Sequence, residues 1–187
     1  EKCDRREEFF TSNGCTLAES GGTAVNVSLV ESIEGAYDNE LHGYENEAYT
    51  LDVTASDITI TAIKPTGIIR AAQTLTQMAE GWDGQASLEA VSIKDWPAFK
   101  LRGYMHDVGR SFISADELVK QVEKFSRFKV NTFHWHMTEN QAWRFEVKAY
   151  PQLTSAESMT RFPGQYYTQE DCQKVLAAAK KHGMLVI

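Results

Sequence analysis

The order of apolar and polar residues divides the chain into two parts that favour different structures. In the first part, alternating runs predict half-buried strands over 24–30, 49–53 and 58–62, and a turn at 55–57 predicts that the last two form a hairpin. Apolar residues at helical spacing predict a helix over 68–78 that ends at Gly81, and residues 88–93 predict another short strand. Residues 1–98 are therefore expected to form an α+β domain, an antiparallel sheet with a helix on one face.

From residue 99 onward, buried strands alternate with amphipathic helices. Strands are predicted over 101–108, 130–137 and 184–187, with one helix between each pair. This order is typical of βαβ units, so residues 99–187 are expected to begin a (β/α)8 barrel as β-α-β-α-β. A whole barrel needs about 250 residues, and the chain stops within an apolar strand. We therefore expect a fragment of a longer protein.

Local signals mark the ends and buried faces of the two later helices. Ser114 and Glu117 predict a capping box, and Thr168 predicts a second N-cap. Gly183 predicts the stop of the second helix. The residues expected to face inward are Leu118, Val122 and Phe125 in the first helix and Cys172, Val175, Leu176 and Ala179 in the second.

Composition narrows the classes of partner. The formal net charge of −7 argues against a nucleic-acid or anionic-membrane surface, and no apolar run approaches the roughly 20 residues of a membrane span. The three cysteines are too few for a disulfide framework, although Cys3 and Cys15 can close a short loop. Cys172 is expected to be a core residue.

Polar side chains follow the first two predicted strands of the second part. Arg110 follows the first strand, and its guanidinium suits either sugar hydroxyls or a carboxylate. It can equally form a structural ion pair with Asp107 or Glu139. Glu139 follows the second strand, where it can serve as an acid, a base or an orienting group.

Two histidines on the second strand offer a different chemistry. His134 and His136 are two residues apart, so their side chains share a face and can bind a divalent metal. We favour hydrogen bonding in a polar barrel interior, because a metal needs further ligands and the chain has five histidines. Trp135 is expected to face the helix layer, while Trp143 and Arg144 are interpreted as packing behind the site.

Several motifs in order resemble one known family. Residues 102–110 (RGYMHDVGR) resemble the R-G-x-x-x-D-x-x-R opening of the β-N-acetylhexosaminidases, the family 20 glycoside hydrolases. Residues 131–138 (NTFHWHMT) resemble their N-x-x-H-W-H-L-T strand, followed by W-R-x-E at 143–146. The resemblance covers about residues 48–187, and its helix around 67–78 is similar to that of the α+β domain before the family's barrel.

The resemblance implies an enzyme that removes terminal β-linked N-acetylhexosamine from glycans by a substrate-assisted retaining mechanism. In this mechanism the sugar's acetamido oxygen attacks the anomeric carbon, and a protein acid protonates the leaving group. Arg110 matches the arginine that holds the terminal sugar, with Glu139, His136 and Asp107 as a supporting network. The chain departs from the family at Glu139, where aspartate is usual, and at Asn140, where a second acidic residue is usual.

The resemblance places the catalytic Asp-Glu pair after a fourth barrel strand. The Asp-Glu at 116–117 is already explained as a helix cap, so the chain by itself is expected to be inactive. The resemblance implies a glycan substrate, no cofactor, no metal and an extracytoplasmic location. Two alternatives stay open: a metal-dependent hydrolase using His134 and His136, and a non-catalytic carbohydrate-binding protein.

Overall fold

The computed structural model describes residues 22–36, 45–79 and 88–187, which separate into two compact units that divide between Lys100 and Leu101. Cys3, Cys15 and Gly81 lie outside the described residues, so the predicted pairing and the helix stop at Gly81 are not described. Among the described residues, no helix is long and apolar enough to cross a membrane.

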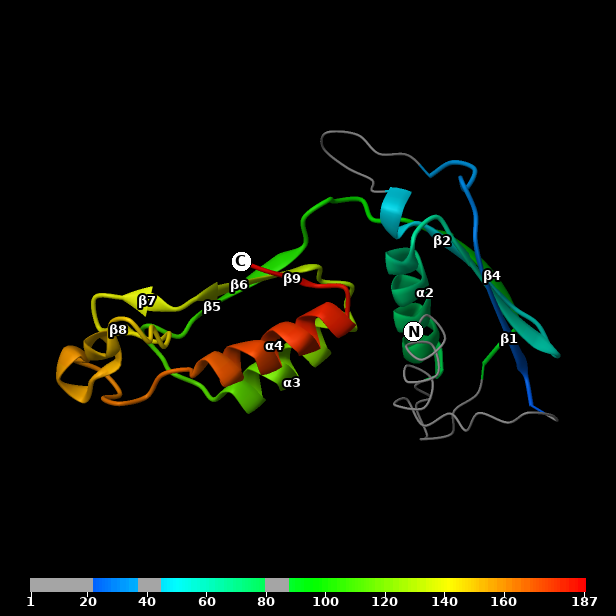
Figure 1. Ribbon diagram of the computed structural model, residues 1–187. Coiled ribbons are helices and arrows are strands. Elements are labelled where there is room, and N and C mark those ends of the chain that lie inside the picture. Colours follow the sequence, from blue (N-terminus) through cyan, green and yellow to red (C-terminus); the bar gives the residue numbers. More distant parts are fainter. Residues whose placement is uncertain (1–21, 37–44, 80–87) are drawn as a thin grey trace. The chain divides into compact units, whose positions relative to one another are not determined.

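The first unit contains a four-stranded sheet in the order β1-β3-β2-β4 (Figure 1). Its strands are β1 (Ala24–Leu29), β2 (Tyr49–Val53), β3 (Asp57–Ala62) and β4 (Val91–Asp95). The predicted hairpin is confirmed, because β2 pairs antiparallel with β3. The prediction of an antiparallel sheet is wrong for β1, which pairs parallel with β3 and makes the sheet mixed.

Strand β1 is also more exposed than its alternating pattern predicted. The exposed fractions of Val25 and Leu29 are 37% and 55%. The physical reason is position, since β1 is an edge strand and the helix α2 (Pro65–Ala79) contacts β2 and β3. The core of the unit therefore lies under the central strands, where Leu51 and Ile60 are fully buried.

Helix α2 carries a buried ion pair that the sequence did not reveal. Arg70 is paired with Glu47 of the short 3-10 helix η1 (Glu45–Glu47), and both side chains are nearly inaccessible. The Arg70 Nη1 atom also donates to Gln73 Oε1 at 3.1 Å. Periodicity alone assigns charged residues to the solvent face, so this contact needed the tertiary structure.

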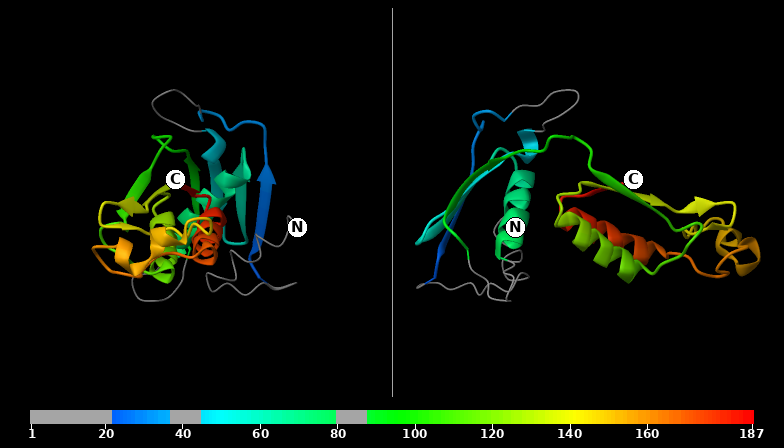
Figure 2. Two further views of the ribbon diagram at one scale, coloured as in Figure 1. Left: turned by 60° about the vertical axis from the view of Figure 1, so that its left-hand side comes forward. Right: turned by 180° about the vertical axis from the view of Figure 1, so that it is seen from behind.

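In the second unit, three parallel strands are covered on one face by two helices (Figures 1 and 2). The strands are β5 (Gly103–Asp107), β6 (Thr132–His136) and β9 (Leu185–Val186), and the helices are α3 (Ala115–Ser126) and α4 (Gln169–Lys181). A hairpin of β7 (Thr138–Glu139) and β8 (Ala142–Trp143) follows β6, and the short helices η2 (Pro151–Thr154) and η3 (Ala156–Ser158) precede α4.

The helix-covered face of this sheet holds a row of aromatic rings. Tyr104 stacks on Phe133 with 4.8 Å between ring centroids, and Trp135 meets Tyr167 edge-on at 4.8 Å. Trp135 therefore faces the helix layer, as predicted. Two expected core residues are not fully covered, because the exposed fractions of Phe125 and Leu176 are 38% and 42%.

The helix ends follow their sequence signals with one difference. Ser114 accepts from the Glu117 amide at 3.3 Å, but the Glu117 carboxylate contacts Lys120 rather than reaching back, so the predicted box is half formed. Helix α4 has the complete capping box, closed by Thr168 and Asp171. Gly183 has a φ of 63°, which confirms the predicted stop.

Replacing Thr168 with alanine should destabilise the second unit by about 1 kcal/mol, because the N-terminus of α4 loses one side of its capping box. The hydroxyl accepts from the Asp171 amide at 3.1 Å and donates to the Asp171 carboxylate at 2.9 Å. Urea denaturation measures the change. The Thr168→Ser variant keeps the hydroxyl and should retain most of the stability, so equal losses in both variants would contradict this account.

Candidate functional site

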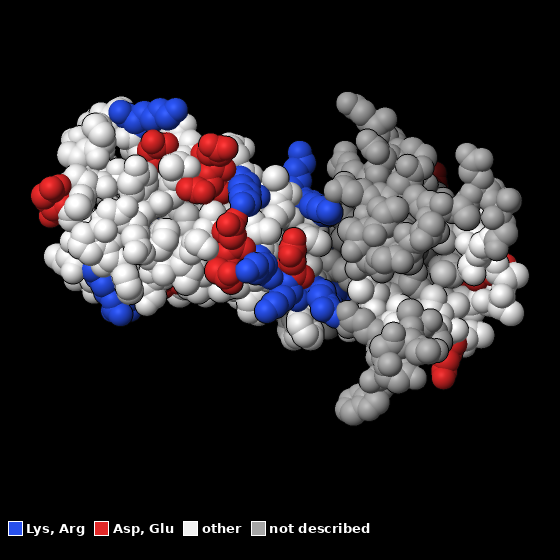
Figure 3. Space-filling view, turned by 90° about the horizontal axis from the view of Figure 1, so that it is seen from below, with Lys and Arg blue, Asp and Glu red and all other residues white. Residues whose placement is uncertain are grey.

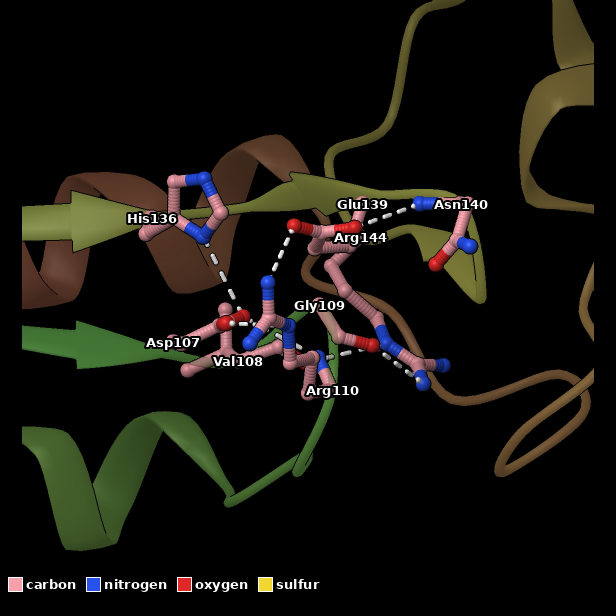
Figure 4. A network of polar contacts seen from close by, with 8 residues as sticks. All are labelled: Asp107, Val108, Gly109, Arg110, His136, Glu139, Asn140 and Arg144. Atoms are coloured by element: carbon pink, nitrogen blue, oxygen red, sulfur yellow. Dashed lines mark hydrogen bonds and ion pairs between the residues drawn. The ribbon is translucent and has the colours of Figure 1, made fainter.

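Arg110 lies in the turn after β5, where two carboxylates hold it (Figure 4). Its Nε is 3.1 Å from Asp107 Oδ2, and its Nη2 donates to Glu139 Oε1 at 2.8 Å. The backbone N–H of Arg110 also donates to Asp107 Oδ1 at 3.1 Å. Both ion pairs considered from the sequence are thus present together.

The arginine is nevertheless available to a ligand. Its side chain is 59% exposed. A guanidinium has five N–H groups, and the two carboxylates contact only Nε and Nη2, so Nη1 has no partner among the described residues. The ion pairs therefore fix the direction of the fork while leaving donors that face solvent.

Glu139 is placed by the short hairpin that follows β6. Its Oε2 accepts from the Asn140 amide at 2.9 Å. The hydrogen bond from Arg110, assisted by that amide, lowers the pKa of Glu139 below its usual range, so it is an anion at neutral pH. This state suits an orienting group that pairs with a cation, and it does not suit a proton donor.

Gly109 is needed for this approach of two segments. A Cβ at Gly109 would lie 2.8 Å from Glu139 Cβ and 3.1 Å from the Glu139 backbone nitrogen. A side chain there would displace either the turn or the hairpin. The close approach of the hairpin therefore explains why a glycine stands directly before Arg110, at an x position of the R-G-x-x-x-D-x-x-R motif.

Asp107 and His136 face each other across neighbouring strands, since the two residues are in register. His136 Nδ1 lies 3.1 Å from Asp107 Oδ1. Burial opposes ionisation of Asp107, but the Arg110 amide, His136 and the Arg110 charge outweigh it and lower the pKa of Asp107. The structure therefore brings together Arg110, Asp107, His136 and Glu139, the four residues singled out from the sequence.

The structure lends no support to the metal alternative. The His134 and His136 rings are 6.0 Å apart between centroids and are nearly perpendicular. Among the described residues, no three His, Cys, Asp or Glu side chains gather in a way that could hold a metal ion. His136 instead approaches Asp107, which accounts for its place on the strand.

The Asp-Glu pair at 116–117 lies away from these four residues, in the first turn of α3. Asp116 is ion-paired with Lys174 of α4, and Glu117 bonds Lys120 at 2.6 Å. Acidic and basic side chains also lie next to one another on the face of the second unit seen in Figure 3. Asp116 and Glu117 thus act as helix-surface residues.

The structure gives defined contacts to Arg144, which the sequence predicted only as a packing residue. Arg144 directly follows β8, is fully buried, and contacts the backbone at the end of β5 (Figure 4). Its position after a tryptophan in W-R-x-E was the available signal. That pattern did not show which groups the guanidinium contacts.

Stability of the second unit should fall in acid because Asp107 and Glu139 have lowered pKa values in the folded chain. A group with a lowered folded pKa stabilises above its unfolded pKa, about 4, and loses that contribution as the pH falls through the folded value. Urea midpoints between pH 3 and 7 measure the slope. Asp107→Asn should flatten part of it. A slope unchanged from that of the wild type would contradict the assignment.

Comparison with solved structures defines the class of protein. A β-N-acetylhexosaminidase from Bacteroides fragilis superposes with a TM-score of 0.80 at 27% identity, covering 100% of this chain and 38% of that one. An exo-β-N-acetylglucosaminidase from Vibrio harveyi, solved with N-acetylglucosamine, gives a TM-score of 0.75 at 30% identity. That match covers 99% of this chain and 30% of the Vibrio chain. The mixed α/β fold is therefore that of glycoside hydrolases.

Sequence comparison identifies the family. The model described as "Glycosyl hydrolase family 20, domain 2" matches residues 6–96, and "Glycosyl hydrolase family 20, catalytic domain" matches residues 99–187. The chain belongs to glycosyl hydrolase family 20. Beta-hexosaminidase 1 of Coccidioides posadasii is 34% identical over 182 residues, covering 96% of this chain. The chain spans 30% of the length of that relative.

Proposed function

We propose that this chain supplies the N-terminal α+β domain, residues 1–98, and the first part of the (β/α)8 barrel, residues 99–187, of an exo-acting β-N-acetylhexosaminidase. The strand and helix order β5-α3-β6-α4-β9, with three parallel strands, supports the barrel assignment. The complete protein would remove terminal β-linked N-acetylhexosamine from glycans by the substrate-assisted retaining mechanism.

The arrangement of Arg110 is the single observation that carries this proposal. Parallel strands that end at one edge place their following residues together, and the active sites of (β/α)8 enzymes lie at that edge. Arg110 lies there, where Asp107 contacts its Nε and Glu139 contacts its Nη2, and neither ion pair uses Nη1. A planar fork of donors fixed in this way fits two neighbouring hydroxyls of a sugar ring.

In this proposal Asp107 and Glu139 are anions that orient Arg110, and neither donates a proton to the sugar. Asp107 and Glu139 both have lowered pKa values, so the cluster presents one arginine flanked by two anions. His136 contacts Asp107 through its Nδ1 atom, which lies 3.1 Å from Asp107 Oδ1. In this proposal Arg110 binds the sugar, and the acid comes from an Asp-Glu pair outside the four-residue cluster.

Assays of two proteins test the proposal. The complete protein should hydrolyse a chromogenic N-acetyl-β-glucosaminide, whereas the purified 187-residue chain should not, because its Asp116 and Glu117 are engaged on helix α3. Turnover by the chain alone would overturn the assignment of the acid. If the complete protein bound N-acetylglucosamine but released no chromophore, the non-catalytic carbohydrate-binding alternative would replace the glycosidase.

Location follows from the resemblance alone and stays a prediction. An enzyme that acts on glycans is expected outside the cytoplasm, in the periplasm, in the medium or on the surface. Cell fractionation of the source organism, with antibody detection of the complete protein, measures its location. Recovery in the cytoplasmic fraction alone would contradict the prediction.

A further inference from the structure

Arg144 is a buried cation whose hydrogen-bonding capacity is fully used by backbone carbonyls. Its exposed fraction is 0%. A guanidinium has five N–H groups, and five carbonyl oxygens accept hydrogen bonds from them, while Nη1 also lies 3.3 Å from Met159 Sδ. The carbonyl oxygens belong to Val108 at 3.1 Å, Gly109 at 3.3 Å, Arg161 at 2.7 Å, Phe162 at 2.9 Å and Gln165 at 2.7 Å.

No carboxylate among the described residues pairs with this guanidinium, and burial lowers the pKa of Arg144. A buried charge is retained only where hydrogen bonds replace its hydration. Simple packing would not require one, since an apolar side chain could fill the same volume. The carbonyl contacts therefore point to a role in holding backbone segments in place.

The contacts join the turn that precedes Arg110 to the loop 161–165. Nε and Nη2 hold the carbonyls of Val108 and Gly109, which immediately precede Arg110. Nη1 and Nη2 hold the loop 161–165. The Arg144 backbone is itself fixed, because its N–H donates to Met137 O at 3.0 Å and its carbonyl accepts from the Tyr167 N–H at 2.8 Å.

A displacement of Gly109 would move the neighbouring residues Arg110 and Glu139. Gly109 has no room for a Cβ against Glu139, and Glu139 bonds Arg110 at 2.8 Å. A shift of the Val108–Gly109 peptide would therefore change the position of Arg110 relative to Glu139. Figure 4 shows the guanidinium groups of Arg144 and Arg110 on opposite sides of Gly109.

We propose that Arg144 is a positioning residue for the sugar site, fixing the turn that carries Arg110 by saturating the carbonyls on its buried side. The proposal deepens the function proposed above and rests on it for the identity of the ligand. Lysine cannot substitute, because an ammonium has three donors and no planar fork. Arg144 acts through Arg110 and does not touch the ligand.

Nuclear magnetic resonance on the folded 187-residue chain tests the positioning without any substrate. In Arg144→Lys, the side-chain signals of Arg110 should shift, and the pKa of Glu139 should rise toward its ordinary value as the ion pair loosens. Arg127→Met, which removes an exposed arginine at the C-cap of α3, is the control and should change neither. A folded Arg144→Lys chain with wild-type Arg110 signals and Glu139 pKa would overturn the proposal.

Kinetics of the complete protein give the second measurement. Arg144→Lys should raise KM for the chromogenic glucosaminide about 10-fold or more, because the arginine that binds the sugar is displaced. A fall in active fraction with unchanged KM would indicate a purely structural role and count against the proposal, as would unfolding of both Arg144→Lys and Arg144→Met. If the wild-type protein shows no turnover, the proposed function fails while the resonance experiment still decides the positioning.

Discussion

Replacing Arg110 with methionine should lower kcat/KM of the complete protein for an N-acetyl-β-glucosaminide roughly 100-fold, the effect of losing two charge-assisted hydrogen bonds. Methionine keeps much of the side-chain length but has no donors. The side chain is 59% exposed, so the fold should be little affected. Initial rates over a range of substrate concentrations, with circular dichroism to verify folding, measure the change.

Two further variants separate charge from geometry at this position. Arg110→Lys keeps the cation but not the planar fork, and it should recover only a small part of the lost activity. Arg127→Met removes an exposed arginine at the other end of α3 and should keep normal kinetics. Wild-type activity in Arg110→Met would show that the arginine does not bind the sugar, and full rescue by lysine would show that charge alone matters.

Replacing Gly67 with alanine should destabilise the first unit by about 2–3 kcal/mol, although alanine is the better helix former. A Cβ at this position would overlap the Ala48 carbonyl oxygen and lie 2.9 Å from Ala62 Cβ. Neither neighbour is the flexible end of a side chain. Helix α2 must then move away from β3, which opens the core beneath it.

Thermal or urea unfolding monitored on the first unit gives the size of this effect. For a unit of about 100 residues, a loss of this size lowers Tm by roughly 10 °C or more. Gly22→Ala is the matched control, since a Cβ there meets nothing within 4 Å. Equal stability of Gly67→Ala and wild type would mean that α2 does not approach the sheet as closely as described.

Local sequence signals predicted the elements well where a single segment was enough. The hairpin of β2 and β3, the outward direction of Trp135, the Thr168 cap and the Gly183 stop all follow from neighbours within a few residues. The half-formed box at Ser114 shows the limit of such signals. Glu117 has two competing partners within one helical turn, and its contact with Lys120 excludes the reach back to the N-cap.

Contacts between distant segments were less predictable. The parallel pairing of β1 with β3, the burial of Arg70 against Glu47 and the partial exposure of Leu176 depend on which elements pack together. In the site, the sequence predicted either Asp107 or Glu139 as an ion-pair partner for Arg110. The structure shows both at once, because β5 ends beside the hairpin that follows β6.

The sequence by itself determined the family and singled out the four residues that the structure brings together, since motif order and strand periodicity are properties of the linear chain. Only the tertiary structure decided how those residues cooperate. It showed that Glu139 and Asp107 both pair with Arg110, and that Arg144 binds two carbonyls of the turn before Arg110 and three carbonyls of the loop 161–165. Carbonyl groups are common to every residue, so no pattern of side chains predicts which of them a buried guanidinium will bind.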